Sequence, residues 1–280
     1  MTVMRGIKNT LRLTKLTIDE GVKSYYDFED FDSVGKDLHY TGRDLTTTLL
    51  KRDIKINPLR ERLTWRSERQ RRGVSLDDLP FAEFIAETTA KGIAREVNKY
   101  AYYAKKVDGS SVSKSFDGIG TQIAKAIESE NSVPGSGIVP VATGEITAQN
   151  AVSKFEMVME AMPTEFRAHG FNLYCSYDLF DKYNKDYRER YKKNFACNTD
   201  GVFHVDNTAG MVRVIPCTWM RESQRIIATP QENLLMGIDG DNDMDKIHTH
   251  SEFEIIKWRV MFNLGYAIRD YDAMRVNDQV

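Results

Sequence analysis

Two of the five histidines are the best candidates for metal chemistry in this sequence. His248 and His250 stand two positions apart, so they would share one face of a strand, and zinc accepts imidazole ligands at that spacing. The stretch before them, 239–245, is acidic, but it fails the pattern of a calcium loop because Met244 stands where glycine is required. We favour a solvated acidic turn followed by a polar strand edge, and we expect no metal ion and no cofactor.

Nucleophilic chemistry has no recognisable support in the sequence. The three cysteines form no CxxC pair and leave an odd count, which argues against a disulfide framework and against a cysteine zinc site. Cys175 lies in an apolar run, where a small buried side chain is its expected role. There is no serine elbow of the GxSxG type, no phosphate-binding GxxxxGK(S/T) loop and no HExxH helix. We therefore do not expect an enzyme.

Composition and charge exclude several classes of protein. The 280 residues carry a net charge of −2, from 39 basic and 41 acidic side chains, so no global field draws the chain onto nucleic acid or anionic lipid. Hydrophobic residues make up 41%, enough for one large domain or two closely packed ones. No segment approaches the roughly 20 apolar residues of a membrane span, and no secretory signal is recognisable. We expect folding in a reducing cytoplasm and no contact with membrane.

An extended hairpin is predicted near the N-terminus. Apolar residues at mostly even spacing predict a strand over 5–18, and a second extended stretch covers 45–56. Between them, 19–44 is rich in Asp, Gly, Tyr and Phe without a clear period, which predicts a long excursion that ends in turns at Gly35 and Gly42. The two extended stretches are expected to pair as an open hairpin around this excursion.

A basic helix is predicted directly after the second extended stretch. Asn57 and Pro58 are typical of a helix start, and the stretch 58–72 carries six arginines, Arg60, Arg62, Arg66, Arg69, Arg71 and Arg72. This patch could contact acidic protein surface or phosphate, or it could be a solvated face balanced by Glu61 and Glu68. Both interpretations stay open, although a helix with so few apolar residues needs some partner surface.

The longest helix is predicted next, and the later elements alternate irregularly, which indicates the α+β class. The long helix would start near Asp77 and run to about Ala104, about 25 residues or about 40 Å. Shorter helices are expected near 117–129, 147–163 and 177–193, the last capped by Ser176. Strands are expected at 171–175, 202–205, 211–217, 225–229 and 233–238. Long antiparallel strands close the chain over 252–268, where a shift in apolar alternation predicts a β-bulge.

Short motifs along the whole chain resemble those of one known family. They are Gly6-Ile-Lys-Asn-Thr-Leu-Arg-Leu, Leu79-Pro-Phe-Ala-Glu-Phe-Ile, Ala161-Met-Pro-Thr-Glu-Phe-Arg, Phe171-Asn-Leu-Tyr-Cys and Phe262-Asn-Leu-Gly-Tyr-Ala-Ile. No single motif is specific, and the order of the elements carries the resemblance. The sequence resembles the major capsid proteins of tailed bacteriophages, which have the Hong Kong 97-type fold, and especially those from phages of gut Bacteroidetes.

The resemblance implies a division of the chain and a function. It implies an N-terminal arm, extended hairpin loop and basic helix over 1–75, a peripheral domain with a spine helix over 76–116, an axial domain over 117–236, and peripheral C-terminal strands over 237–280. Subunits would assemble as pentamers and hexamers into an icosahedral virion shell around phage double-stranded DNA, without sequence-specific DNA binding, in the bacterial host cytoplasm. Portal, scaffolding and decoration proteins would be the other partners, and the scaffold is expected as a separate protein because the chain begins directly with the arm.

Contacts between subunits are expected in two segments. A long excursion cannot bury its aromatic residues against itself, so a neighbour would cover Tyr25, Tyr26, Phe28 and Phe31. The six arginines of 58–72 would meet acidic surface on that neighbour. Three alternatives remain open: an encapsulin-type nanocompartment shell protein with the same fold, a nucleic-acid-binding module built on the basic helix, and an α+β enzyme that uses the pair His248 and His250.

Overall fold

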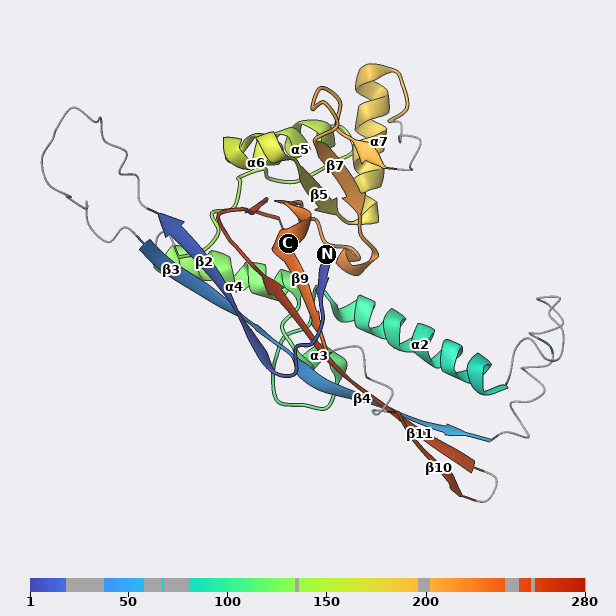
Figure 1. The fold of residues 1–280 in the computed structure, drawn as a ribbon. Coiled ribbons are helices and arrows are strands. Elements are labelled where there is room, and N and C mark those ends of the chain that lie inside the picture. The colour runs from blue at the N-terminus through green and yellow to red at the C-terminus, as the bar shows by residue number, and fades with distance from the viewer. Residues whose placement is uncertain are drawn as a thin grey trace, which may run out of the picture.

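The computed structural model describes residues 1–18, 38–57, 67, 81–133, 136–195, 202–239, 247–252 and 255–279. Within these ranges the strands form two five-stranded sheets and one two-stranded ribbon (Figure 1). Helices and strands are mixed, which confirms the α+β class predicted from the sequence. Among the helices described, none is both long and apolar enough to cross a membrane.

The first sheet is built around β11 (Ile255–Ile268). One side of β11 pairs antiparallel with β4 (Thr48–Ile56). The other side pairs with β10 (Ile247–Glu252) and then with β9 (Leu234–Ile238), whose far edge pairs in parallel with β1 (Thr2–Met4). The outer parts of β4, β10 and β11 extend away from the body (Figure 1). Because Glu252 is the register partner of Ile255, the shift in apolar alternation marks a reversal between two strands, and the predicted bulge is wrong.

The second sheet has the strand order β12-β8-β5-β7-β6. Its strands are β12 (Arg275–Val276), β8 (Ile227–Thr229), β5 (Phe171–Cys175), β7 (Val212–Pro216) and β6 (Phe203–His204). The central strand β5 is buried along its whole length, as its apolar sequence requires, and its predicted limits are confirmed. Strands β6, β7, β8 and β9 lie within the four short stretches predicted for them.

Three helices accompany the second sheet, α5 (Ala151–Glu160), α6 (Thr164–His169) and α7 (Tyr177–Tyr191). Phe155 of α5, Leu173 of β5 and Leu179 of α7 belong to one core cluster and are each at most 1% exposed. The predicted cap of α7 is confirmed, because the Ser176 hydroxyl accepts a hydrogen bond of 3.3 Å from the Leu179 amide.

The N-terminal prediction of one strand over 5–18 is wrong. Gly6 has φ of +82°, a conformation that favours glycine, so the chain turns after β1 and β2 begins only at Thr10. β2 (Thr10–Ile18) pairs antiparallel with β3 (Leu38–Thr46), from Ile18 opposite Leu38 down to Thr10 opposite Thr46. The partner of β2 is therefore the last part of the predicted excursion, whereas most of the predicted stretch 45–56 forms β4 and pairs with β11.

The long helix ends earlier than predicted. α2 (Phe81–Tyr100) has 20 described residues, about 30 Å. After Tyr100 the Tyr102 carbonyl accepts a hydrogen bond of 3.0 Å from the Gly120 amide, at the start of α4 (Ile119–Ser132). A Cβ atom on Gly118 would lie 2.5 Å from the Tyr102 carbonyl oxygen, so only glycine permits this approach. The helix ends because its following residues pair with α4, which the local sequence does not reveal.

Candidate subunit-contact surfaces

The residues predicted to make subunit contacts all lie outside the described part of the chain. These are Tyr25, Tyr26, Phe28 and Phe31 of the excursion and Arg60, Arg62, Arg66, Arg69, Arg71 and Arg72 of the basic segment. Their roles therefore stay predictions. The structure does describe β2 and β3, which flank the excursion, and their attachment to the body. It also describes β4 and α2, which precede and follow the basic segment in the sequence, and the surfaces that they form.

The β2–β3 ribbon has two different faces, because register partners in an antiparallel pair lie on the same face. On the inner face Leu45 is fully buried and Leu11 and Leu13 pack against the same small core as Ile7. On the outer face Leu16 is 50% exposed and its partner Tyr40 is 72% exposed. The ribbon thus carries an uncovered apolar pair on the face that looks away from the body.

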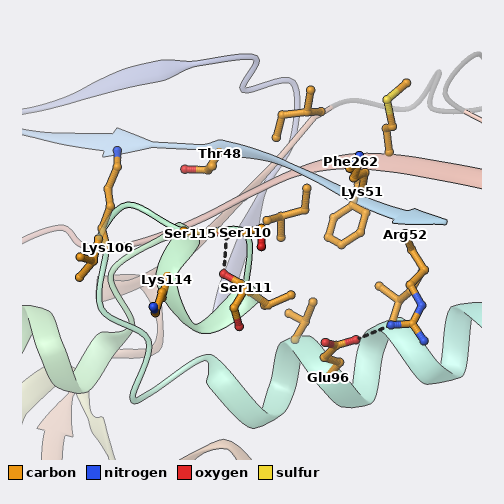
Figure 2. A pocket seen from close by; sticks show the side chains of 18 of the residues that line it. Thr48, Lys51, Arg52, Glu96, Lys106, Ser110, Ser111, Lys114, Ser115 and Phe262 are labelled. Atoms are coloured by element: carbon orange, nitrogen blue, oxygen red, sulfur yellow. Dashed lines mark hydrogen bonds and ion pairs between the residues drawn. The ribbon is translucent and has the colours of Figure 1, made fainter.

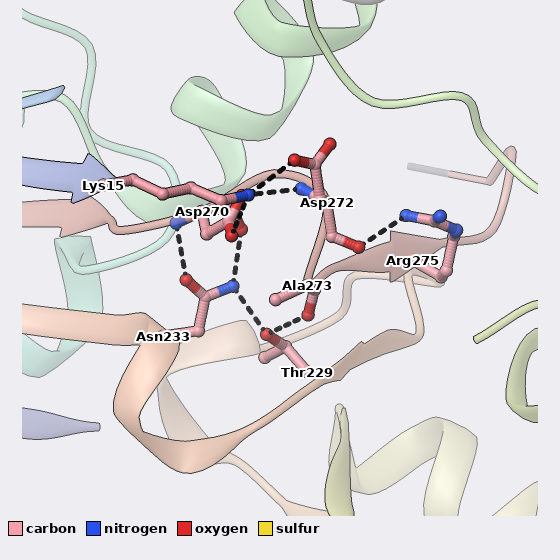
Figure 3. Close-up of polar contacts among 7 residues, drawn as sticks. All are labelled: Lys15, Thr229, Asn233, Asp270, Asp272, Ala273 and Arg275. Atoms are coloured by element: carbon pink, nitrogen blue, oxygen red, sulfur yellow. Dashed lines mark hydrogen bonds and ion pairs between the residues drawn. The ribbon is translucent and has the colours of Figure 1, made fainter. Parts of the chain in front are cut away.

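A polar anchor attaches the inner face of the ribbon to the body (Figure 3). Lys15 Nζ lies 2.7 Å from a carboxylate oxygen of Asp270 and 2.7 Å from one of Asp272. Burial alone would lower the pKa of Lys15, but the hydrogen bonds to the two carboxylates outweigh it and raise the pKa above its usual value. Beside this contact the Arg43 guanidinium stands 3.1 Å above the centre of the Tyr271 ring.

The turn that receives the ribbon is itself rigidly held. Asn233, which is 4% exposed, accepts a hydrogen bond of 2.7 Å from the Asp270 amide and donates one of 2.7 Å to the Asp270 carbonyl. The Asn233 side-chain amide also donates to Thr229 Oγ1 at 2.8 Å, and the Thr229 hydroxyl donates to the Ala273 carbonyl at 2.9 Å (Figure 3). The turn joins β11 of the first sheet to β12 of the second, so the ribbon is fixed at the junction of both sheets.

The outer part of the first sheet carries the two histidines considered for metal binding. His248 is the register partner of Arg259, and His250 is the register partner of Lys257. Across β11, Arg259 makes a bidentate ion pair with Asp53, at 2.6 and 3.1 Å. Hydrogen bonding from this guanidinium lowers the pKa of Asp53. Basic residues therefore occupy the positions opposite both histidines, and the one carboxylate among these register partners is already engaged, which is unfavourable for a divalent cation.

The cysteines that the structure describes are poor nucleophiles. Cys175 is fully buried, as predicted, and burial raises its pKa well above the usual thiol value. Burial also raises the pKa of Cys217 to about 12. Among the described residues, no group of three or more His, Cys, Asp and Glu side chains is arranged to hold a metal ion.

A cationic groove lies between β4, the C-terminal half of α2 and the loop that contains α3 (Val112–Ser115), with a volume of about 880 Å³ (Figure 2). Its lining includes four basic residues, Lys51, Arg52, Lys106 and Lys114, and two acidic ones, Glu96 and Asp108. Arg52 is paired with Glu96 at 3.2 Å and Lys51 approaches Asp53 at 3.6 Å. Leu49 and Val107, which are 60% and 53% exposed, add an apolar part to the lining.

The sequence predicted neither the Lys15 anchor nor the cationic groove. One signal for the anchor was present: Lys15 continues the even spacing of Leu11 and Leu13, so a strand places a charge on the apolar face, where it needs a partner. Its partners, Asp270 and Asp272, stand at the other end of the chain, and no local pattern connects them. The groove likewise combines short pieces of three distant segments.

Comparison with known proteins shows the fold. No protein-family model matches the sequence, and no curated protein matches it. Solved capsids match along the whole chain. A capsid subunit of cyanophage A-1(L) has a TM-score of 0.62 at 10% identity, over 100% of this chain and 89% of that chain. The capsid of an empty GTA particle has a TM-score of 0.59 at 14% identity, over 99% of this chain and 86% of that chain.

A third solved structure belongs to a different kind of shell. The SrpI encapsulin from Synechococcus elongatus matches with a TM-score of 0.56 at 11% identity, over 99% of this chain and 84% of that chain. At sequence identities this low, the structural similarity demonstrates a shared fold and does not extend to function. The chain therefore has the Hong Kong 97-type capsid fold, as predicted from the order of its elements.

Proposed function

We propose that this protein is a structural major capsid protein, which self-assembles as pentamers and hexamers into an icosahedral shell that encloses phage double-stranded DNA. The observation that carries the proposal is the extent of the structural likeness: 99% or more of the chain aligns with each of two capsid subunits. The SrpI encapsulin aligns over 99% of the chain as well, so this likeness supports a shell subunit, and the contents of the shell decide between a capsid and a nanocompartment.

The surfaces of the chain support an assembling role. The β2–β3 ribbon and the outer parts of β4, β10 and β11 extend from the body (Figure 1). Such extensions are hard to stabilise unless something else covers them. The outer face of β2–β3 exposes Leu16 and Tyr40, and a repeated contact with a second copy would bury this pair.

The finer points of the proposal rest on the sequence resemblance. The domain limits at 75, 116 and 236 belong to it, although β12 pairs within the second sheet and so brings part of the C-terminal segment beside the proposed axial domain. A virion location, assembly in the bacterial cytoplasm, partnership with portal, scaffolding and decoration proteins, and likeness to phages of gut Bacteroidetes also belong to it.

Electron microscopy of the expressed full-length chain tests the proposal. We expect closed icosahedral particles built of pentamers and hexamers, formed alone or on co-expression with a scaffolding protein encoded beside it. Chains that remain monomers under both conditions would contradict a shell role.

The alternative is an encapsulin-type nanocompartment, which the match to the SrpI encapsulin supports. The two shells differ in content. Particles purified from the native source should contain double-stranded DNA protected from nuclease if the protein is a phage capsid subunit. Particles that contain a protein cargo and no protected DNA would favour the nanocompartment.

The basic segment 58–72 gives a second test of assembly. Reversing two of its charges, with Arg66→Glu and Arg69→Glu, should prevent shell formation and leave the monomer folded, because these side chains are proposed to meet acidic surface on a neighbour. Particle yield by sedimentation and the far-ultraviolet circular dichroism of the soluble chain are the two measurements. Normal particle yield from the double variant would remove this role from the segment.

A further inference from the structure

A second cationic surface lies where the C-terminal half of α2 meets the 3-10 helix η1 (Thr218–Met220). A hollow of about 580 Å³ lies between the two elements. Its lining includes Arg95 and Lys99 of α2 and Arg221 after η1, and all three are exposed. Arg95 and Lys99 are four residues apart, so they share one face of the helix, about 6 Å apart along its axis. These three residues form the α2–η1 patch.

The three cations of the patch are not neutralised by carboxylates. Among the ion pairs of the described residues, none involves Arg95, Lys99 or Arg221. Glu96 is the one acidic side chain among the described lining residues, and it is already paired with Arg52 at 3.2 Å. Cations gathered around a hollow attract an anionic partner locally, even though the chain as a whole has a net charge of −2.

A fourth cation, Arg225, lies in the same loop and is buried without an acidic partner. It is 4% exposed, and within the described part of the chain its Nε and Nη1 atoms have no hydrogen-bond partner. The Ser223 hydroxyl joins this residue to the end of α2, because it accepts a hydrogen bond of 3.1 Å from the Arg225 amide and donates one of 3.2 Å to the Tyr102 hydroxyl. An unpaired charge in this position adds to the positive potential of the loop.

The backbone holds Arg221 in a conformation that few side chains adopt. Its φ is +49° and its ψ is −117°, a combination that favours glycine. The preceding residues fix this conformation, because Trp219 and Met220 are buried and the Arg221 amide donates a hydrogen bond of 3.3 Å to the Thr218 carbonyl. An arginine at a position where glycine would be less strained indicates a role for its side chain other than stability.

The composition of the lining fits a phosphate backbone better than a protein surface. Besides the charged groups it includes Tyr100 and the pair Asn98 and Thr218, whose side chains share a hydrogen bond of 2.8 Å. Side chains of these types are common contacts of phosphate and sugar. The cationic groove differs, because exposed Leu49 and Val107 contribute to its lining. Without comparable apolar groups among its described lining residues, the α2–η1 hollow lacks an anchor for a protein partner.

We infer that the α2–η1 patch binds the phosphate backbone of double-stranded DNA, independently of its sequence. This inference rests on the proposed shell function, which supplies the DNA, and it names the side chains that would contact it. Arg95, Lys99 and Arg221 would each neutralise one phosphate. Three such contacts give weak binding by a single chain, but a shell presents the patch once in every subunit, so many weak contacts would together hold the packaged duplex.

A binding experiment with the full-length chain tests the inference without requiring a shell. The probe is a short fluorescein-labelled DNA duplex of mixed sequence, titrated with the chain at low salt and followed by fluorescence anisotropy. We expect saturable binding, and the logarithm of the association constant should fall against the logarithm of the salt concentration with a slope of about −3, the value for about three neutralised phosphates. A duplex of a different sequence should bind equally well, because only its backbone is contacted.

Charge reversal distinguishes the patch from the net charge of the chain. Arg95→Glu with Arg221→Glu should weaken duplex binding about tenfold or more and reduce the magnitude of the salt slope by about two. Lys185→Glu with Arg188→Glu is the matched control, because these α7 residues are exposed, do not line the hollow and change the net charge equally. The control should bind like the unmodified chain. Absence of binding by the unmodified chain, or equal weakening in the two double variants, would overturn the inference.

Arg221→Gly tests whether this residue serves binding or the fold. Glycine adopts a positive φ without strain, so the variant should unfold at the same denaturant concentration as the unmodified chain or at a higher one, and it should bind the duplex more weakly. Easier unfolding with unchanged duplex binding would make Arg221 structural and remove it from the site. A glutamate-rich peptide that displaces the duplex and binds more tightly through Arg95 and Arg221 would make the patch a protein contact, and this would also overturn the inference.

The outcome is distinguishable from the fate of the proposed function. If the chain forms particles but shows no duplex binding that depends on the patch, the DNA contact is wrong and the shell role stands. If the patch binds the duplex but the chain never forms particles, the contact stands and the shell role is wrong. The double variant Arg95→Glu with Arg221→Glu should still form particles in normal yield, because the patch is proposed to contact DNA and not another subunit, but these particles should retain less nuclease-protected DNA.

Discussion

The second sheet with its helices and the β2–β3 ribbon bury their apolar side chains in opposite ways. Around β5 the core is complete within one chain, since Phe155, Leu173 and Leu179 are enclosed by their own neighbours. The ribbon buries only one face, attaches it through a polar anchor, and leaves Leu16 and Tyr40 uncovered on the other. The first region therefore supplies stability within the folded chain, whereas the second leaves an apolar surface that we propose another copy covers.

The largest effect is expected in the core of the compact region. Phe155→Ala should lower the free energy of unfolding by about 3–5 kcal/mol, because it removes a fully buried ring and leaves a cavity. Met157 on the same helix is 38% exposed, so Met157→Ala should change the free energy by less than about 1 kcal/mol. Chemical denaturation followed by circular dichroism measures both. Equal losses of stability from the two variants would show that the Phe155 side chain is not packed in a core within the single chain.

A smaller loss is expected from the polar contact that joins α5 to α7. Asp186 is 2% exposed, accepts a hydrogen bond of 2.7 Å from the Val152 amide at the start of α5, and pairs with Arg190 at 2.8 Å. Asp186→Ala leaves that amide without its partner and should cost about 2 kcal/mol in the free energy of unfolding. Asp186→Asn keeps an acceptor oxygen and should recover part of the loss. If the asparagine variant is as unstable as the alanine variant, the ion pair with Arg190 matters more than the capping of α5.

Local signals were sufficient for much of the compact region. The unbroken apolar run of β5 and the serine cap of α7 lie within a few residues of what they determine, so their limits could be predicted from the sequence. The end of α2 could not, because it depends on the close approach of Tyr102 to Gly118. β3 was missed because its inner face includes Thr41 and Arg43, and the strand is stabilised by β2 and by Tyr271, not by an apolar pattern of its own.

The candidate contact surfaces were predictable only in part. Composition predicts that the aromatic and acidic excursion makes contacts, because the local sequence shows which groups lack a partner within the segment. It could not show the groove or the anchor, which need residues more than 200 positions apart, such as Lys51 with Met261 and Lys15 with Asp270. Surfaces that are completed by distant segments, or by another copy, leave no periodic signal in the sequence.

The ribbon anchor should affect mobility much more than stability. Lys15→Met removes both ion pairs of a side chain that is 37% exposed, so the free energy of unfolding should fall by less than about 1 kcal/mol. The β2 and β3 amides should nevertheless exchange faster with solvent, because the inner face loses its polar attachment. Hydrogen exchange measured by mass spectrometry resolves the ribbon from the body.

Arg12→Met is the matched control for the anchor. Arg12 lies on the outer face, three residues away on the same strand. Its pair with Asp44 is longer, at 3.7 Å, and its side chain is 67% exposed. Faster exchange confined to the Lys15 variant would confirm that the anchor holds the ribbon. The same acceleration in both variants would mean that any lost charge on β2 loosens it.

The smallest effect on the folded chain is expected at the uncovered pair of the ribbon, where the effect on assembly should be large. Leu16→Ser with Tyr40→Ser should change the free energy of unfolding by less than about 0.5 kcal/mol, because both side chains are at least half exposed in the single chain. If a second copy covers them, their apolar area contributes only in the particle, and particle yield by sedimentation should fall. Thr14→Ala alters the same outer face but removes only one methyl group of apolar area, and it should assemble normally. A double variant that unfolds more easily would place the pair in the fold of its own chain, and one that assembles normally would place it outside any contact, so either result would end the distinction between a region that folds the chain and a ribbon that joins it to others.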